Sequence, residues 1–201
     1  MKNRLSRWTF SILISSAFLV AAGALSLCIG SAGIPITKII SILLDGRGTS
    51  EYSILVDIRL PRIILGFAIG GALSLAGVIL QGMFRNPLVE PYTLGISGGA
   101  ALGTSICIIL KLNRLIPDIA MPLSGFIGAL LVILLVYFIN TRRGIFMIQG
   151  LLLTGVMISF ISSSLVILIL AISRTEDLHG IIFWIMGSLE EPNWVLIWVA
   201  T

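Results

Sequence analysis

Residues 59–103 place the strongest constraint on what this chain can fold into. Two long apolar stretches, both rich in glycine, flank a short polar segment at residues 85–91. Long apolar stretches with so many glycines are not typical of soluble domains. They are typical of helices that pack closely in lipid, because small residues let the helix backbones approach one another. The polar segment is long enough only for a tight reversal, so this region predicts two consecutive membrane-spanning helices.

The composition of the whole chain agrees with a location in a lipid bilayer. Hydrophobic residues make up 57% of the chain and charged residues only 11%, whereas ordinary globular domains carry roughly 25% charged residues. The net charge of +4 is ordinary for a membrane protein, and no run of basic residues is interleaved with aromatic ones. A nucleic-acid partner is therefore not expected.

The pattern of apolar runs predicts an all-α, polytopic transmembrane helical bundle with about five complete spans. About 20 apolar residues cross the hydrocarbon core of a bilayer. The chain is expected to be one transmembrane domain, residues 1–201, that lacks its C-terminal half. A short amphipathic helix is expected at 35–44, a charged loop at 174–180, an apolar segment too short to span at 181–189, and the start of a sixth span at 194–201. The five expected spans are residues 8–30, 63–82, 92–110, 119–139 and 147–172.

The basic segment Met1–Arg7 favours a cytoplasmic N-terminus and a multi-pass protein of the cell membrane. Counted over the whole chain, this segment included, lysines and arginines divide almost evenly between the two sides, so their number alone does not decide the orientation. A cleaved signal peptide is the competing interpretation of the first span, because Ala22-Gly23-Ala24 could imitate a cleavage site.

Glycines recur every four residues in the second and third expected spans, and a proline-rich hinge joins the two. We expect the stripes to be packing surfaces, although glycines could also leave room in a pore. In the hinge, Asn86 is expected to cap backbone groups and the prolines to end the helices. The stripes are Gly66 and Gly70, then Gly95, Gly99 and Gly103; the hinge residues are Asn86, Pro87 and Pro91.

No catalytic, metal-binding or cofactor-binding set is evident in the sequence. Cys28 and Cys107 lie in separate apolar runs and are expected to be packing residues, and His179 is the single histidine. The sequence has no phosphate-binding glycine loop, so the chain is not expected to be an enzyme or to hydrolyse ATP. No acid or histidine lies securely within a span, which disfavours an ion-coupled secondary transporter. Two other functions are kept as alternatives to the one that the resemblance described next implies: an ion-coupled secondary transporter and a non-transporting membrane scaffold.

The same region resembles the permease family of bacterial ABC importers for iron-siderophores, haem and vitamin B12, the FecCD/BtuC type. The residues that carry the resemblance keep a common order and spacing over about 45 residues. They are Arg59-Leu60-Pro61-Arg62, Gly71-Ala72-Leu73, Ala76-Gly77, Gln81, Asn86-Pro87-Leu88, Pro91, Leu94-Gly95 and Gly98-Gly99-Ala100. The resemblance implies a membrane permease subunit that translocates an iron(III)-siderophore, haem or a corrinoid.

The resemblance also implies partners and roles for particular residues. A second permease subunit, two ATP-binding subunits and an extracytoplasmic binding protein are expected. Arg59 and Arg62 are expected to dock the binding protein through its carboxylates; the simpler alternative is that both are interfacial anchors. Thr154, Ser162 and Ser163 are expected to line the translocation path, and hydrogen bonds between helices are the alternative.

Overall fold

The computed structural model describes residues 2–30, 32–141 and 148–189, and helices dominate this part of the chain. The predicted start of a sixth span at 194–201 lies outside the described residues. The elements, in chain order, are α1 (Lys2–Cys28), α2 (Ile36–Asp45), α3 (Ser50–Ser53), the π-helical turn η1 (Ile54–Arg59), α4 (Leu60–Phe84), the 3-10 turn η2 (Pro91–Leu94), α5 (Ile96–Ile109), the 3-10 turn η3 (Leu112–Arg114), α6 (Pro117–Thr141), α7 (Ile148–Ile172) and α8 (Thr175–Met186).

The all-α transmembrane architecture predicted from the sequence is confirmed. Four helices in the described part are long and apolar enough to cross a membrane: Arg4–Cys28, the continuous helical stretch Ser50–Phe84, Ile119–Thr141 and Gln149–Ile172. Their positions agree with four of the five expected spans. No strand occurs among the described residues.

The third expected span, 92–110, is shorter in the structure than the sequence indicates. Its first residues form the 3-10 turn η2, and α5 has only 14 residues. At 1.5 Å per residue, such a helix covers about 21 Å, less than the hydrocarbon core of roughly 30 Å. Gly95 separates the two pieces with a left-handed backbone, φ 83°. The apolar run at 92–110 indicates how many residues are suited to the membrane. It does not indicate that the helix is interrupted at Gly95.

A second difference concerns residues 174–180, which were expected to form a charged loop. Instead Thr175 begins α8, and Glu176 and Asp177 lie in its first turn. Carboxylates are favourable there because the amino end of a helix carries partial positive charge. The charged residues therefore start a helix that continues through the short apolar segment to Met186.

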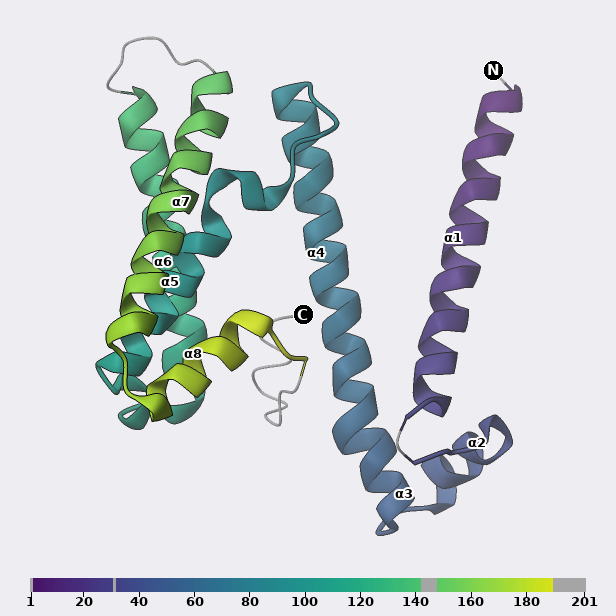
Figure 1. The fold of residues 1–201 in the computed structure, drawn as a ribbon. Coiled ribbons are helices and arrows are strands. Elements are labelled where there is room, and N and C mark those ends of the chain that lie inside the picture. The colour runs from purple at the N-terminus through teal and green to yellow at the C-terminus, as the bar shows by residue number, and fades with distance from the viewer. Residues whose placement is uncertain (1, 31, 142–147, 190–201) are drawn as a thin grey trace. The chain divides into compact units, whose positions relative to one another are not determined.

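Contacts divide the chain into two compact units, which we describe separately. One contains Met1–Gly71 and Leu189, and the other is Ala72–Ser188. In the first, Ile39 and Ile42 of α2 pack with Ile34 and with Leu55 of η1. In the second, α5, α6 and α7 lie side by side with α8 across them (Figure 1). Val132, Val136, Leu151 and Ile158 form the core between α6 and α7.

Candidate functional site

Gly99 and Gly103 of α5 lie close against the backbone of α6. A Cβ added at Gly99 would lie 2.6 Å from both the Gly128 carbonyl oxygen and Val132 Cγ2, and one at Gly103 would collide with the Ser124 carbonyl. Such distances are far below van der Waals contact, so only glycine permits this approach of α5 to α6. Close backbone approach of this kind is typical of helices that associate in lipid.

The stripe on α4 has different surroundings. A Cβ added at Gly66 would make only ordinary contact, 3.7 Å from Leu189 Cδ1, and one at Gly70 would meet no atom within 4 Å. The sequence pattern of the two stripes is the same, since both repeat every four residues. Spacing alone did not reveal which of them meets a neighbouring helix within the described chain.

The hinge between α4 and α5 is built from backbone hydrogen bonds. Arg85 adopts a left-handed conformation, φ 49°, directly after α4, and the amide of Asn86 donates to the carbonyl of Gln81. This arrangement closes the end of a helix and normally uses glycine at the left-handed position. The Asn86 carboxamide oxygen accepts from the amide of Leu88 at 3.0 Å. Pro91 begins η2, where a missing amide costs nothing.

Thr154 of α7 takes part in a hydrogen bond between helices. Its hydroxyl oxygen accepts from Nδ2 of Asn140 on α6 at 3.1 Å, and the same amide nitrogen donates to the Val136 carbonyl at 2.8 Å. Asn140 is buried. This partner was not identified from the sequence, although a lone carboxamide near the end of an apolar span is a recognisable signal for such a role.

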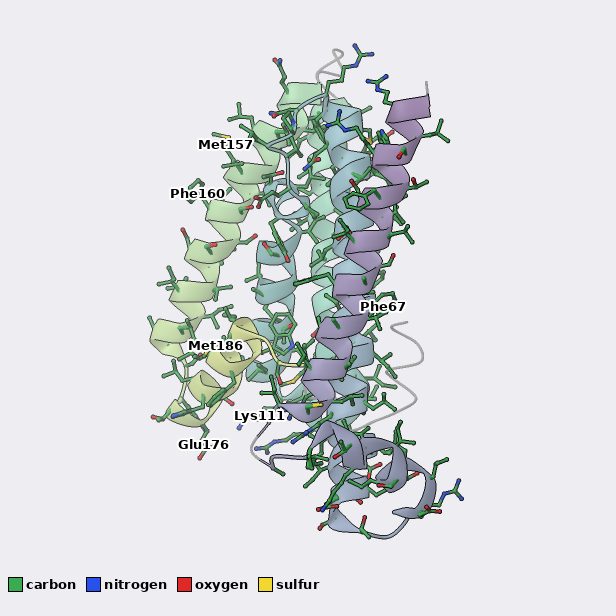
Figure 2. The ribbon with its side chains drawn as sticks, turned by 90° about the vertical axis from the view of Figure 1, so that its right-hand side faces the viewer. Phe67, Lys111, Met157, Phe160, Glu176 and Met186 are labelled. Carbon is green, nitrogen blue, oxygen red and sulfur yellow. The ribbon has the colours of Figure 1, made fainter. Side chains whose placement is uncertain are left out.

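Polar residues of α7 point in different directions. Ser162 is buried against α5, because a Cβ at Gly98 would lie 3.1 Å from Ser162 Cβ. Ser163 and Ser164 are exposed, as are Met157 and Phe160, which Figure 2 shows on the outer side of α7. The three expected path residues therefore do not share one surface.

Side chains of the second unit line at least two cavities. One of about 200 Å³ is lined almost entirely by apolar side chains: Met83, Phe84, Leu94, Ile133, Val136, Tyr137 and Leu151. Another, of about 330 Å³, lies where α5 and α7 end, and is lined by Ile109, Lys111, Ile172, Ser173, Arg174 and Asp177. Neither cavity includes Thr154, Ser162 or Ser163.

Arg59 and Arg62 lie in contrasting environments although only three residues separate them. Arg59, the last residue of η1, is 8% exposed. Its guanidinium donates to the backbone carbonyls of Leu27 and Ala32. Arg62, in the first turn of α4, is exposed.

Cys28, Cys107 and His179 lie in different environments. Cys107 is buried and Cys28 is half-buried, and both are free thiols. His179 is exposed, with Nδ1 2.8 Å from the carbonyl oxygen of Thr175. Among the described residues, no three metal-ligating side chains come together.

We expect Thr154→Val to lower the thermal stability of the protein modestly. The change keeps the side-chain volume but leaves the Nδ2 group of Asn140 with one acceptor instead of two. Hydrogen bonds between membrane helices contribute about 0.6 kcal/mol on average and up to about 1.7 kcal/mol. Thr141→Val is the matched control, since the Thr141 hydroxyl donates within its own helix to the Tyr137 carbonyl. Equal losses in detergent melting curves would contradict a specific bond between α6 and α7.

Comparison with known proteins places this helical arrangement among transport permeases. The model of the FecCD transport family matches residues 18–201. The molybdate import system permease MolB of Haemophilus influenzae is 36% identical over 182 residues, which cover 88% of this chain and 53% of the relative. The vitamin B12 import system permease BtuC of Klebsiella pneumoniae is 32% identical over 198 residues, which cover 98% and 56%. The hemin transport system permease HmuU of Yersinia pestis is 34% identical over 179 residues, covering 87% and 53%.

A solved structure supports the same arrangement. It is described as an inward-facing conformation of a metal-chelate type ABC transporter, and it superposes with a TM-score of 0.78 at 30% identity. The match covers 94% of this chain and 56% of the solved chain. The chain thus spans about half the length of the relatives it matches.

Proposed function

This chain belongs to the FecCD transport family, and from that premise we propose that it is part of the membrane permease subunit of a binding-protein-dependent ABC importer. The match over residues 18–201 carries the proposal, and the four apolar helices of spanning length agree with it. The complete subunit would work with a second permease subunit and two separate ATP-binding subunits. Hydrolysis of ATP would belong to those subunits, because this sequence lacks a phosphate-binding loop.

The proposed cargo is an iron(III)-siderophore or a related large chelate such as haem or cobalamin. Support comes from the names of the relatives, which include importers of vitamin B12 and hemin, and from the solved metal-chelate transporter. A relative named for molybdate makes a small oxyanion the competing cargo. Titration of the associated binding protein with each of these compounds would separate the two classes.

We further propose that the exposed face of α7 lines the translocation path. Ser163 and Ser164 offer hydroxyls on that face, whereas Ser162 packs against α5 and Thr154 bonds to Asn140. The last two residues would then support the path from behind, by fixing α7 against its neighbours.

The proposed orientation places the N-terminus in the cytoplasm and the segment that contains α2 outside. The basic residues before the first span motivate it. Arg47 is exposed in the turn after α2, so Arg47→Cys provides a probe. An impermeant thiol reagent should label it from outside intact cells, and labelling only from the cytoplasmic side would reverse the orientation.

The importer assembly can be tested through the ATPase activity of the complete complex. The full-length permease should copurify with its ATP-binding subunits, and addition of the binding protein should stimulate ATP hydrolysis. A scaffold protein would show no such stimulation. A permease that neither associates with an ATPase nor responds to a binding protein would contradict the proposed function.

Docking of the binding protein is proposed at the start of α4, where the family motif places Arg59 and Arg62. We expect the double variant Arg59→Glu, Arg62→Glu to weaken binding. Truncating one partner of a buried charge pair costs about 2–5 kcal/mol, whereas an exposed pair contributes roughly 0–1 kcal/mol. The expected loss of binding free energy lies between these two values. Replacing the carboxylates of the binding protein by basic residues should recover part of it. Unchanged affinity in a folded double variant would make both arginines interfacial anchors only.

A further inference from the structure

We propose that the cavity where α5 and α7 end binds the headgroup of a zwitterionic phospholipid, of the phosphatidylethanolamine type. Lys111 and Arg174 would hold the phosphate of this lipid, and Asp177 would hold its ammonium group. The inference concerns a part of the molecule that the proposed transport function does not use. It therefore does not depend on which cargo is transported.

The cavity lies at one end of the membrane-spanning helices. α7 is apolar and of spanning length up to Ile172, and Ser173 and Arg174 follow directly. Lys111 follows the end of α5 in a similar way. Figure 1 shows these two ends together in the second unit, where α8 begins. Basic side chains at the ends of membrane helices reach the interface with water, so the cavity lies at the level of the lipid headgroups.

The lining of the cavity combines charges of both signs. Its volume of about 330 Å³ falls within the range of small-molecule sites, about 300–1,000 Å³. Lys111 and Asp177 are half-buried and Arg174 is exposed. Among the described residues, no ion pair joins Asp177 to either cation. A simple anion would meet repulsion from Asp177, whereas a zwitterionic headgroup uses all three charges: the cations for its phosphate and the carboxylate for its ammonium group.

The remaining residues of the lining favour a lipid over a soluble zwitterion. Ile172, the last residue of α7, is 74% exposed, and Ile109, the last residue of α5, is half-buried. With the headgroup in the cavity, the glycerol and acyl chains would lie along these apolar side chains. The Ser173 hydroxyl donates to the carbonyl of Ile169 in its own helix. The phosphate would therefore rely on the two cations.

The backbone at Lys111 has a conformation that disfavours a side chain. Its φ of 56° is left-handed, and its amide closes the end of α5 by donating to the Ile108 carbonyl at 3.0 Å. Glycine is the usual residue at such a position. One benefit of lysine there is its charge at the carboxyl end of α5, which would stabilise the fold in any lipid. The proposed site instead makes stability depend on which lipid is present.

Lipid retention by the complete transporter tests the site. The full-length permease with its ATP-binding subunits would be purified in detergent and mixed with phosphatidylethanolamine, phosphatidylcholine or phosphatidylglycerol of the same acyl chains. Native mass spectrometry would count the retained lipids, and melting curves would report stability. We expect phosphatidylethanolamine to raise the melting temperature more than phosphatidylcholine does, because a quaternary ammonium group cannot donate a hydrogen bond to Asp177.

Lys111→Gln and Arg174→Gln identify the contribution of the cavity. Each removes a charged donor, so the affinity for phosphatidylethanolamine should fall about tenfold or more. Arg114→Gln is the matched control, because Arg114 is exposed in the same interhelical turn as Lys111 and does not line the cavity. Equal loss of affinity in Arg114→Gln and Arg174→Gln would overturn the proposal.

Asp177→Asn tests the assignment of the ammonium group. It should weaken binding of phosphatidylethanolamine and strengthen that of phosphatidylglycerol, because the carboxylate no longer repels an anionic headgroup. Glu176→Gln removes the same charge from the first turn of α8, but Glu176 does not line the cavity, so lipid preference should be unchanged.

Three further results would contradict a site for a zwitterionic lipid. Displacement of the Arg174-dependent lipid by inorganic phosphate would mark a site for free anions. Binding of phosphatidylglycerol that depends on Arg174 but not on Asp177 would mark a site for anionic lipids. If the glutamine variants do not fold, the wild-type protein still decides, since equal effects of phosphatidylethanolamine and phosphatidylcholine on its melting temperature would refute the proposal.

Discussion

Gly99→Leu in α5 is expected to destabilise the protein strongly and to lower its melting temperature. The first atom of the new side chain would lie 2.6 Å from the Gly128 carbonyl oxygen and equally close to Val132 Cγ2. The clash with Gly128 involves backbone, which cannot rotate away as a side chain can, so α5 and α6 must separate. Overpacking typically costs 1–3 kcal/mol and sometimes more, a large part of a total stability of about 5–15 kcal/mol.

The yield of monodisperse protein and its melting temperature in detergent measure this effect. Gly70→Leu is the matched comparison, since it makes the same change in a stripe with the same spacing. A Cβ at Gly70 would meet no atom within 4 Å in the described chain, so a smaller loss is expected. Normal stability of Gly99→Leu would contradict the packing of α5 on α6, and equal losses would mean that the α4 stripe is as tightly packed in the complete protein.

Gly95→Val is expected to be similarly severe, because it combines strain with crowding. The residue has φ 83°, which is a genuine outlier for a β-branched side chain. Its Cβ would also lie 2.9 Å from the Gly155 carbonyl oxygen and 3.1 Å from Val132 Cγ1. The turn η2 and the start of α5 could not keep their places against α7, so the melting temperature should fall strongly.

Gly48→Val separates these two causes. Gly48 has nearly the same backbone conformation, φ 89°, but a Cβ there would meet nothing within 4 Å. It therefore carries the strain of a left-handed residue without the crowding, and its melting temperature should fall less. If the two variants lose the same stability, backbone strain alone accounts for Gly95, and close packing of η2 on α7 contributes nothing.

The helical architecture could be predicted from the sequence because lipid imposes simple rules. A membrane helix must satisfy its backbone internally and present about 20 apolar residues to the bilayer. Runs such as 119–139 and 147–172 follow those rules directly. The break at Gly95 does not disturb the apolar run, so composition could not show that α5 is short. Charges at Glu176 and Asp177 suggested a loop, although they are equally suited to a first helical turn.

The roles of individual site residues were harder to predict, because they depend on partners distant in sequence. Spacing identified the glycines of α5 but not the residues that they meet, Gly128 and Val132. The arginine motif indicated one shared role for Arg59 and Arg62, since residues three apart in a helix share a face. Only the fold shows that the Arg59 guanidinium lies by Leu27, 32 residues away. Ser162 and Ser163 are neighbours in sequence, yet one is buried and the other exposed.

Uptake by the complete transporter in proteoliposomes tests the proposed importer function most directly. The full-length permease would be reconstituted with its ATP-binding subunits, and a radiolabelled ferric siderophore, hemin, cobalamin or molybdate supplied with the binding protein. We predict accumulation of a large chelate only when ATP and the binding protein are both present, and none with an ATPase unable to hydrolyse ATP. Accumulation driven by a proton or sodium gradient without ATP, or without need of the binding protein, would contradict an ABC importer.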